Sequence, residues 1–222
     1  MPCLFDVVPR LKRFIVGSVV VIGVALVIVG GLWAVDYFRL TRVGEDYPPN
    51  ATVAASSVVS EKRPDMQKDD YSVAASQPRK IGIPAINVEA YIQRVGVTPS
   101  NDMATPNNLF FAGWYNESPS PGSKGVSIIN GHAGGRYTDG IFRHLNSLNV
   151  GSPFRIQMGD LSWRNFEVTS IASYSVKDAA DVLYRDDRNI EKEVHLITCD
   201  GIFDDATKTY DKRVVVVAKR VE

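Results

Sequence analysis

The chain has 222 residues, and its 25 Lys and Arg balance 25 Asp and Glu, so the formal net charge is zero. This balance excludes a nucleic-acid binder that works by bulk positive charge, and it also excludes an acidic disordered tail. Two cysteines are too few for a disulfide-rich secreted scaffold or for a cysteine-rich zinc site.

The N-terminal part contains an uncharged apolar run at residues 14–35. As a helix, this run is roughly 33 Å long, enough to cross a hydrocarbon core of about 30 Å. Three basic residues precede it, and basic residues concentrate on the cytoplasmic side of a membrane span. We therefore expect a cytoplasmic N-terminus at 1–13 and a transmembrane signal anchor at 14–38, with the rest outside the cell membrane. The alternative is a cleaved signal peptide, whose apolar region is normally shorter, about 7–15 residues.

The next segment, residues 39–79, mixes Pro, Ser and Ala with both charges and has no sustained period of 2 or 3.6 residues. A segment of this kind buries too little apolar surface to offset the entropy lost on ordering. We therefore expect a flexible extracellular stalk that holds a domain away from the bilayer.

The remaining residues, 80–222, are enough for one core and are rich in short β-branched runs separated by Pro and Gly turns. Ile141–Leu148 indicates one or two helical turns. Four consecutive valines near the C-terminus indicate a strand covered on both faces, which favours a barrel over an open sheet. The pattern predicts a mainly β fold, an antiparallel barrel or sandwich. The predicted strands are Lys80–Ile83, Val88–Val95, Val126–Asn130, Phe154–Gln157, Phe166–Ile171, Val194–Thr198 and Val214–Ala218.

Cys199 is the one cysteine after the apolar run, because Cys3 precedes it. Across a membrane the two cannot pair, and a lone thiol in an oxidising exterior is prone to mispairing and oxidation. Cys199 is then either a small buried hydrophobe or a nucleophile. It follows an apolar run and precedes Asp200-Gly201, where we expect the strand to stop, and this position beside a loop favours exposure in a groove.

A nucleophilic thiol needs a base, or an imidazolium that lowers its pKa. His132 lies among glycines, which leave room for a substrate. His144 falls in the predicted helical turns, where a surface or packing role is expected. His195 lies on the strand of Cys199, roughly 13 Å away, too far for a hydrogen bond. His132 is the partner by elimination, although a single histidine is commonly structural.

Arg213 and four aspartates could each be a functional group or a solvated surface charge. Arg213, at the start of the last strand, would hold a carbonyl or an oxyanion, but the sequence alone favours a surface cation. Four loop carboxylates are candidate calcium ligands, but their spacing matches no calcium loop, and solvated charge is the expected role. They are Asp186, Asp187, Asp204 and Asp205.

Several fragments together resemble the sortase family of cysteine transpeptidases over about residues 80–220. The resemblance rests mainly on Asn130-Gly-His132, Leu196-Ile-Thr-Cys199 and Tyr210-Asp-Lys-Arg213, the last followed by the valine run. Further matches are Ile83-Pro-Ala-Ile-Asn-Val, Gly113-Trp-Tyr, Pro121-Gly-Ser-Lys-Gly and Gly140-Ile-Phe-Arg-His-Leu. The pattern departs at His195, a place often held by a hydroxyl or apolar residue.

The resemblance implies a closed, mainly antiparallel eight-stranded β-barrel with short helices and a catalytic groove. By position, Cys199 would be the nucleophile, His132 the general acid/base and Arg213 the substrate and oxyanion holder, while Thr198 matches a residue that supports the oxyanion site. Neither cofactor nor metal is implied. The family cleaves LPxTG-like sorting signals of secreted proteins and joins them to a cell-wall precursor or a pilin lysine. The Gly-Trp-Tyr and Gly-Ile-Phe fragments look more like the compact class D, E and F sortases.

Two alternatives to a transpeptidase fit the same segments. One is a membrane-tethered, non-catalytic β-domain that binds a surface partner, in which Cys199 is buried and unreactive. The other is a cysteine protease, whose thioester intermediate ends in hydrolysis. Alkylation of the folded protein separates the first from an enzyme, and an amine acceptor separates the second from a transpeptidase.

Overall fold

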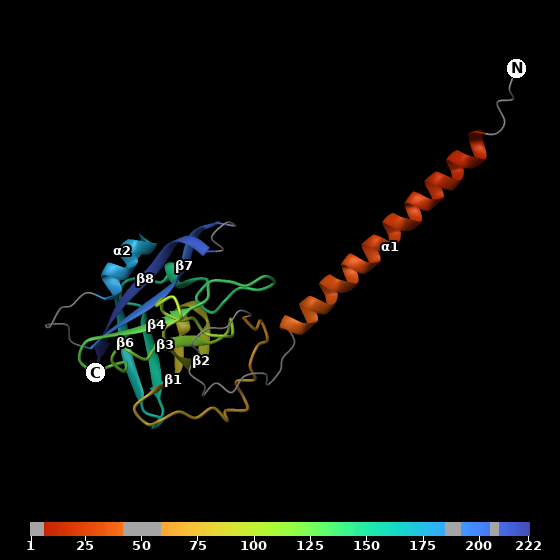
Figure 1. Ribbon diagram of the computed structural model, residues 1–222. Helices are drawn as coiled ribbons and strands as arrows, with labels where there is room; N and C mark the ends of the chain where they lie inside the picture. The colour runs from red at the N-terminus through yellow and green to blue at the C-terminus, as the bar shows by residue number, and fades with distance from the viewer. Residues whose placement is uncertain (1–6, 42–58, 185–191, 205–208) are drawn as a thin grey trace, which may run out of the picture. The chain divides into compact units, whose positions relative to one another are not determined.

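The computed structural model describes residues 7–41, 59–184, 192–204 and 209–222 (Figure 1). The chain divides into two compact units, Met1–Thr41 and Arg42–Glu222. The first is helix α1 (Val7–Thr41), in which Val21–Arg39 is apolar and long enough to cross a membrane. Its described apolar side chains are exposed, as lipid-facing side chains would be. The expected N-terminal apolar helix is therefore confirmed, and it suits a membrane anchor or a signal segment.

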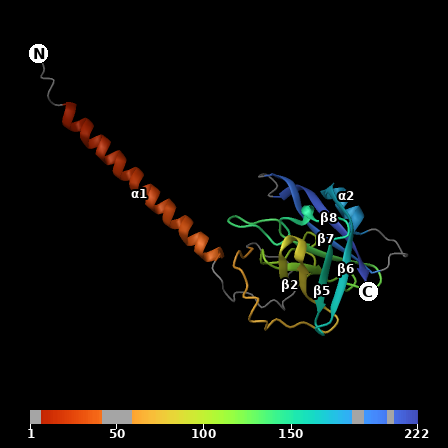
Figure 2. The ribbon, with the colours of Figure 1, turned by 180° about the vertical axis from the view of Figure 1, so that it is seen from behind.

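The second unit is built around a closed barrel of eight strands in the order β1-β2-β3-β4-β7-β8-β6-β5 (Figures 1 and 2). Neighbouring strands are antiparallel except in two pairs, β2–β3 and β4–β7, which are parallel. This confirms the mainly β, closed eight-stranded fold. The strands are β1 (Pro78–Ile83), β2 (Val88–Val95), β3 (Ala112–Tyr115), β4 (Val126–Gly131), β5 (Pro153–Met158), β6 (Trp163–Ser175), β7 (Glu193–Asp204) and β8 (Thr209–Val221).

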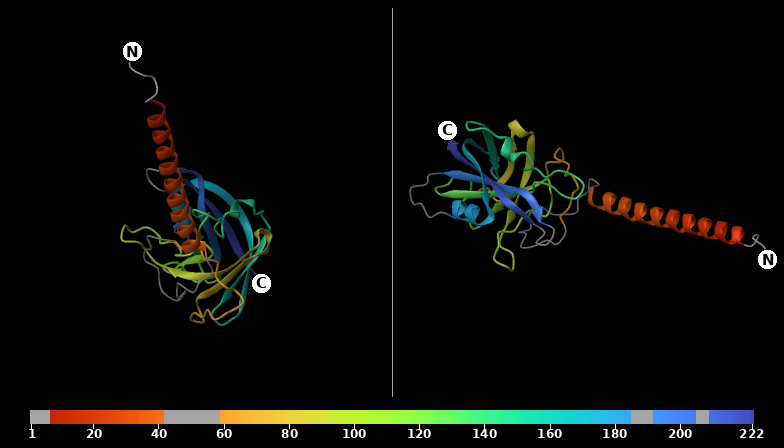
Figure 3. Two further views of the ribbon diagram at one scale, coloured as in Figure 1. Left: turned by 90° about the vertical axis from the view of Figure 1, so that its right-hand side faces the viewer. Right: turned by 90° about the horizontal axis from the view of Figure 1, so that it is seen from above.

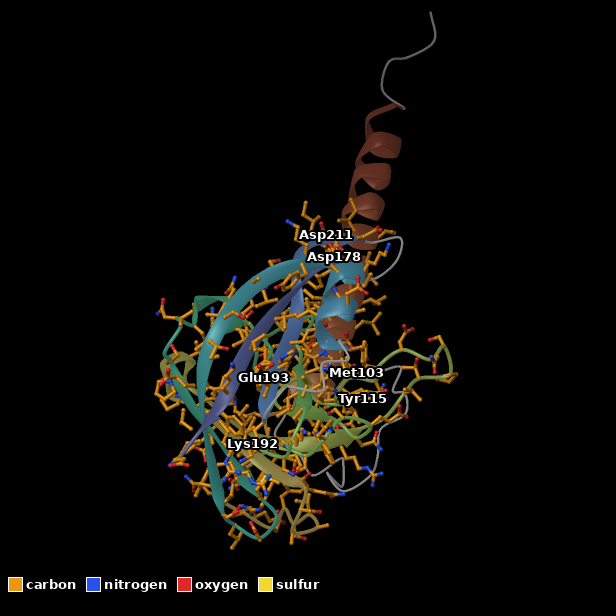
Figure 4. The ribbon with its side chains drawn as sticks, turned by 90° about the vertical axis from the view of Figure 1, so that its left-hand side faces the viewer. Met103, Tyr115, Asp178, Lys192, Glu193 and Asp211 are labelled. Carbon is orange, nitrogen blue, oxygen red and sulfur yellow. The ribbon has the colours of Figure 1, made fainter. Side chains whose placement is uncertain are left out.

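Alternation along β8 explains the valine run. Val214 and Val216 belong to the core inside the barrel, while Val215 lies on the outer face against Leu183 of α2 (Val176–Leu183). Met103 and Tyr115 also lie on this outer face, near each other in Figure 4. A strand packed on both sides needs apolar side chains at successive positions, so the predicted two-sided burial is confirmed.

The predicted helical turns at Ile141–Leu148 contain one short 3-10 helix, η2 (Leu145–Ser147). A second, η1 (Pro84–Ile86), joins β1 to β2. Phe142 is fully buried and packs into the barrel core, and a Cβ added to Gly131 would lie 2.5 Å from its ring. The turn therefore packs tightly against the end of β4, directly before His132.

Three elements, β3, α2 and η1, were not predicted, and the last three strands extend well beyond their predicted bounds. β3 has four residues, and the short α2 begins where Ser175 caps it by accepting a hydrogen bond from the backbone N–H of Asp178. β7 does not stop at Asp200, because Gly201 adopts φ +84° and forms a bulge that lets the strand continue. Ile202 N there donates to the Asp211 carboxylate at 2.7 Å, which ties the bulge to β8.

Residues 59–79, assigned above to a stalk, differ from that expectation because they contact the barrel. In Figures 1 and 3 this orange segment runs beside β1 and β2. Tyr71 is buried, and its hydroxyl donates to Ile92 O at 2.5 Å. Its ring packs edge-on against Tyr91, with centroids 4.8 Å apart. Arg79 Nε donates to Tyr71 O at 2.7 Å. Isolated contacts of this kind have no periodicity, so the sequence pattern did not reveal them.

Candidate active site

Cys199 and Arg213 face each other across two neighbouring strands. Cys199 on β7 pairs directly with Arg213 on β8, and opposed residues of an antiparallel pair have Cβ atoms about 4.5–5.5 Å apart. Both are half-buried, at the level where the two strands change from buried to exposed. By alternation they share the outer face with Ile197 and Val215. The thiol therefore lies beside a guanidinium at the edge of the packed surface.

His132 lies one residue beyond the end of β4, the other neighbour of β7. Parallel pairing sets Asn130 opposite Ile197, so continuing the register by two residues brings His132 opposite Cys199. Residues paired in this way present their side chains on the same face of the sheet. The strand order thus sets Cys199 between Arg213 on β8 and the end of β4, which His132 directly follows.

Thr198 connects β7 to the end of β4. Its side chain is buried, and its hydroxyl donates to Gly131 O at 2.8 Å. Because successive side chains point to opposite faces, this hydroxyl is on the other side of the sheet from the Cys199 thiol. In the structure Thr198 supports the site by fixing the backbone next to His132, and its hydroxyl does not face the thiol.

The imidazole of His132 is oriented by a backbone carbonyl. Its Nε2 lies 2.7 Å from Pro106 O, and a carbonyl can only accept, so we assign the proton to Nε2. Nδ1 is then the nitrogen available to take or give a proton. Burial lowers the pKa of His132, and the hydrogen bond to Pro106 opposes part of that shift. At neutral pH the ring is therefore mainly uncharged.

The loop that carries Pro106 is itself held by buried amides. Asn130 Nδ2 donates to Ala104 O at 2.8 Å, and the buried Gln93 Oε1 accepts from Asn107 N at 3.2 Å. In the sequence, Asn130 stands out only as part of a motif, and Gln93 and Pro106 do not stand out at all. No sequence pattern signals a backbone carbonyl that holds a histidine, so these partners needed the fold.

The Cys199 thiol is free and half-buried. Burial raises its pKa, and the positive charge of Arg213 lowers it by less, so the net shift is upward. Thiol and imidazole are therefore both mainly neutral at pH 7, and the thiolate–imidazolium pair is a minor species.

Alkylation of Cys199 by iodoacetamide is accordingly expected to keep accelerating with pH through 9.0, the ordinary pKa of the thiol, because only the thiolate reacts. Arg213→Gln removes the neighbouring charge and should move the midpoint of this profile to higher pH. Labelling rates from mass spectrometry in a Cys3→Ala background would measure it, with the exposed Arg143→Gln as control. A profile that levels off near pH 7 would contradict the expectation.

The guanidinium of Arg213 is held by hydrogen bonds to nearby residues of its own strand, β8. Nη1 donates to Tyr210 O at 2.9 Å and to Lys212 O at 2.7 Å, and Nη2 donates to Thr209 Oγ1 at 3.1 Å. Arginine has five N–H donors, so these three bonds leave two for a substrate. Arg213 is thus a held, half-buried cation beside the thiol, and not a free surface charge.

The other two histidines lie outside this arrangement. His195 is fully buried, with Nε2 3.3 Å from Glu193 Oε2. Figure 4 shows Glu193 and Asp211 toward opposite ends of the β7–β8 pair. His144 is exposed, as expected. Within the described residues no three His, Cys, Asp or Glu side chains form a metal-binding group, and three of the four calcium candidates, Asp186, Asp187 and Asp205, lie outside the described residues.

Comparisons with known proteins identify the family and the fold. Residues 81–221 match the family model described as a sortase domain. Curated proteins gave no significant match. Among solved structures, the lid mutant of sortase A from Corynebacterium diphtheriae is 23% identical with a TM-score of 0.50, covering 65% of this chain and 70% of that chain. The complex of Streptococcus agalactiae sortase C1 with MTSET is 23% identical with a TM-score of 0.50, covering 68% and 71%. These two likenesses support the fold.

A third solved structure is described as sortase A from Corynebacterium diphtheriae; it is 23% identical with a TM-score of 0.49 over 66% of this chain. The present chain covers 61% of its length.

Proposed function

Because this chain belongs to the sortase family of cysteine transpeptidases, we propose that it is a membrane-anchored enzyme that cleaves a C-terminal sorting signal and joins the new end to an amine. The supporting observation is that Cys199 pairs with Arg213 across β7 and β8, while His132 directly follows β4, the other neighbour of β7. A nucleophile, a proton carrier and a fixed cation are the groups that acyl transfer requires.

In the first half of the proposed reaction, Cys199 forms a thioester with the substrate. The thiol proton passes to Nδ1 of His132 while sulfur bonds to the carbonyl carbon, and the carbonyl oxygen becomes an oxyanion beside Arg213. The carbon–nitrogen bond then breaks, and His132 returns the proton to the departing amine. Nε2–H remains on Pro106 O throughout, so the ring keeps its orientation.

In the second half, an acceptor amine attacks the thioester carbon. His132 takes one proton from the amine as the new carbon–nitrogen bond forms, and that proton returns to sulfur when the carbon–sulfur bond breaks. The net result is one amide exchanged for another, without oxidation or added energy. Water in place of the amine would give hydrolysis instead.

The proposed substrate is an extended LPxTG-like signal at the C-terminus of a secreted protein, and the acceptor a cell-wall precursor or a pilin lysine. Exposed apolar side chains follow Cys199 along β7 and could contact a peptide: Ile202 is 77% exposed and Phe203 is 45% exposed. The fragments at Gly113 and Gly140 favour a compact class D, E or F enzyme.

Helix α1 is proposed to anchor the enzyme with residues 1–13 in the cytoplasm and the barrel outside. The basic residues Arg10, Lys12 and Arg13 support this orientation, because they precede the apolar run. An exterior site would place the thiol where secreted substrates pass.

Trapping the thioester tests the proposal directly. The full-length protein in detergent is mixed with an LPxTG peptide, quenched in acid and digested, and the Cys199 peptide should gain the mass of the acyl fragment. Adding triglycine as amine should discharge that adduct and yield a ligated peptide. Discharge to the free acid alone, even with excess amine, would favour a hydrolase, and no adduct at any time would favour a non-catalytic domain.

A further inference from the structure

The segment directly before the matched domain is built into the surroundings of His132. Ser60 forms a parallel bridge with Asn108: Ser60 N donates to Asn107 O and Leu109 N donates to Ser60 O, both at 2.9 Å. Asn108 Nδ2 also donates to Lys62 O at 2.9 Å. The segment is thereby hydrogen-bonded to the residues that immediately follow Pro106, whose carbonyl holds the imidazole of His132.

A buried carboxylate of the same segment holds the turn that follows His132. Glu61 is 5% exposed, and its Oε1 accepts from Arg136 N at 2.6 Å while Oε2 accepts from Tyr137 N at 3.0 Å. Two successive backbone N–H groups that point at one anion make charge-assisted hydrogen bonds, which are about twice as strong as neutral ones. Glu61 thus accepts hydrogen bonds from two successive backbone N–H groups of one tight turn.

The fit around this carboxylate is close. The turn is narrow, because Gly134 pairs with Asp139 and Gly135 N donates to Thr138 O at 2.8 Å. A Cβ added to Gly135 would lie 2.5 Å from Glu61 Oε1 and would also meet the side chain of Leu109. A glycine is needed here so that carboxylate and turn can approach, and a larger residue would push Glu61 away.

The pairing of Ser60 and the hydrogen bonds of Glu61 hold two different parts of the surroundings of His132. The pairing at Ser60 fixes the segment whose carbonyl orients the imidazole of His132, and Glu61 fixes the turn that continues the backbone of His132. We infer that Glu61 is a positioning residue, which holds His132 level with Cys199 by joining the chain before the domain to the turn after β4. This inference rests on the proposed function of His132.

The expected size of the effect follows from how sharply proton transfer depends on geometry. A misplacement of about 1 Å in a catalytic group costs up to about 10²-fold in rate. Glu61→Gln keeps the shape but turns an N–H₂ toward a backbone N–H, so one of the two hydrogen bonds is lost. We expect kcat/KM for the transfer reaction to fall about 10–100-fold, with the thermal midpoint changed by a few degrees or less.

The experiment uses the full-length protein in detergent, three single variants and one double variant. Glu61→Gln and Gly135→Ala disturb the same contact from its two sides, and Glu167→Gln changes an exposed glutamate on β6 as control. Alkylation of Cys199 at high pH, which needs no histidine, should stay at the wild-type rate in all three. Transfer should fall in the first two only, and the double variant should lose no more than the worse single one, because both remove one contact.

A second readout does not depend on transfer. The ring resonances of His132, identified by their absence in His132→Gln, should shift and broaden in Glu61→Gln and stay in place in Glu167→Gln. If the wild-type protein transfers no peptide but these resonances shift, the proposed function fails and the positioning by Glu61 stands. A folded Glu61→Gln protein with wild-type transfer and unmoved resonances would overturn the inference, as would a loss of transfer that merely follows the unfolded fraction.

Discussion

Cys199→Ala is expected to abolish peptide transfer, lowering kcat/KM by at least about 10⁴-fold. The proposed reaction passes through a bond to sulfur, and in that proposal His132 only carries protons and Arg213 only supplies positive charge, so neither replaces the thiol. Cys199→Ser should fail nearly as completely, because a hydroxyl beside a mainly neutral imidazole is a far weaker nucleophile than a thiol.

The second cysteine provides the matched control. Cys3→Ala removes a thiol from residues 1–13 and should leave transfer unchanged. Rates of ligation of an LPxTG peptide to triglycine, with circular dichroism to verify folding, would compare the three proteins. Ligation by Cys199→Ala at more than a trace of the wild-type rate would exclude Cys199 as the nucleophile.

Much of the barrel could be predicted because its strongest patterns are local. The valines from 214 to 217 indicated burial on both faces, and the structure covers them with the core on one side and α2 on the other. β3 and α2 were not predicted because both are short. A strand of four residues and a helix of two turns have too little periodicity to be distinguished from turns. The bulge at Gly201 was not predicted for a different reason. Asp-Gly usually ends a strand, but here the carboxylate of Asp211 on the neighbouring strand binds the bulge, and β7 continues.

The candidate site also has features that the sequence predicted and features that it did not. Residue type pointed to Cys199 and His132, and only the family resemblance pointed to Arg213. That β7 lies between β4 and β8 follows from a strand order that no local pattern encodes. Thr198 illustrates the limit: alternation correctly separates it from Cys199, yet its partner Gly131 is 67 residues away. Glu61 is a stronger case, because its partner amides are 75 and 76 residues away and its neighbours resemble a solvated spacer.

His132→Gln is expected to lower kcat/KM about 10²–10⁴-fold, the usual range for a lost general acid and base. The glutamine amide can still donate to Pro106 O, so the loop should keep its place, but it cannot accept and return a proton. Attack by sulfur would continue at the rate that the thiolate fraction allows. The departing amine would then leave without a proton, which makes this step the slowest.

The pH profile separates this role from a purely structural one. In the wild-type protein kcat/KM should rise through the pKa of His132, which burial holds below its ordinary value of 6.5, and fall again above the raised pKa of Cys199. In His132→Gln the acid limb should disappear, and the residual rate should climb with pH as the thiolate forms. His144→Gln, which changes an exposed imidazole, should keep both limbs. A bell-shaped profile that survives in His132→Gln would mean that another group carries the proton.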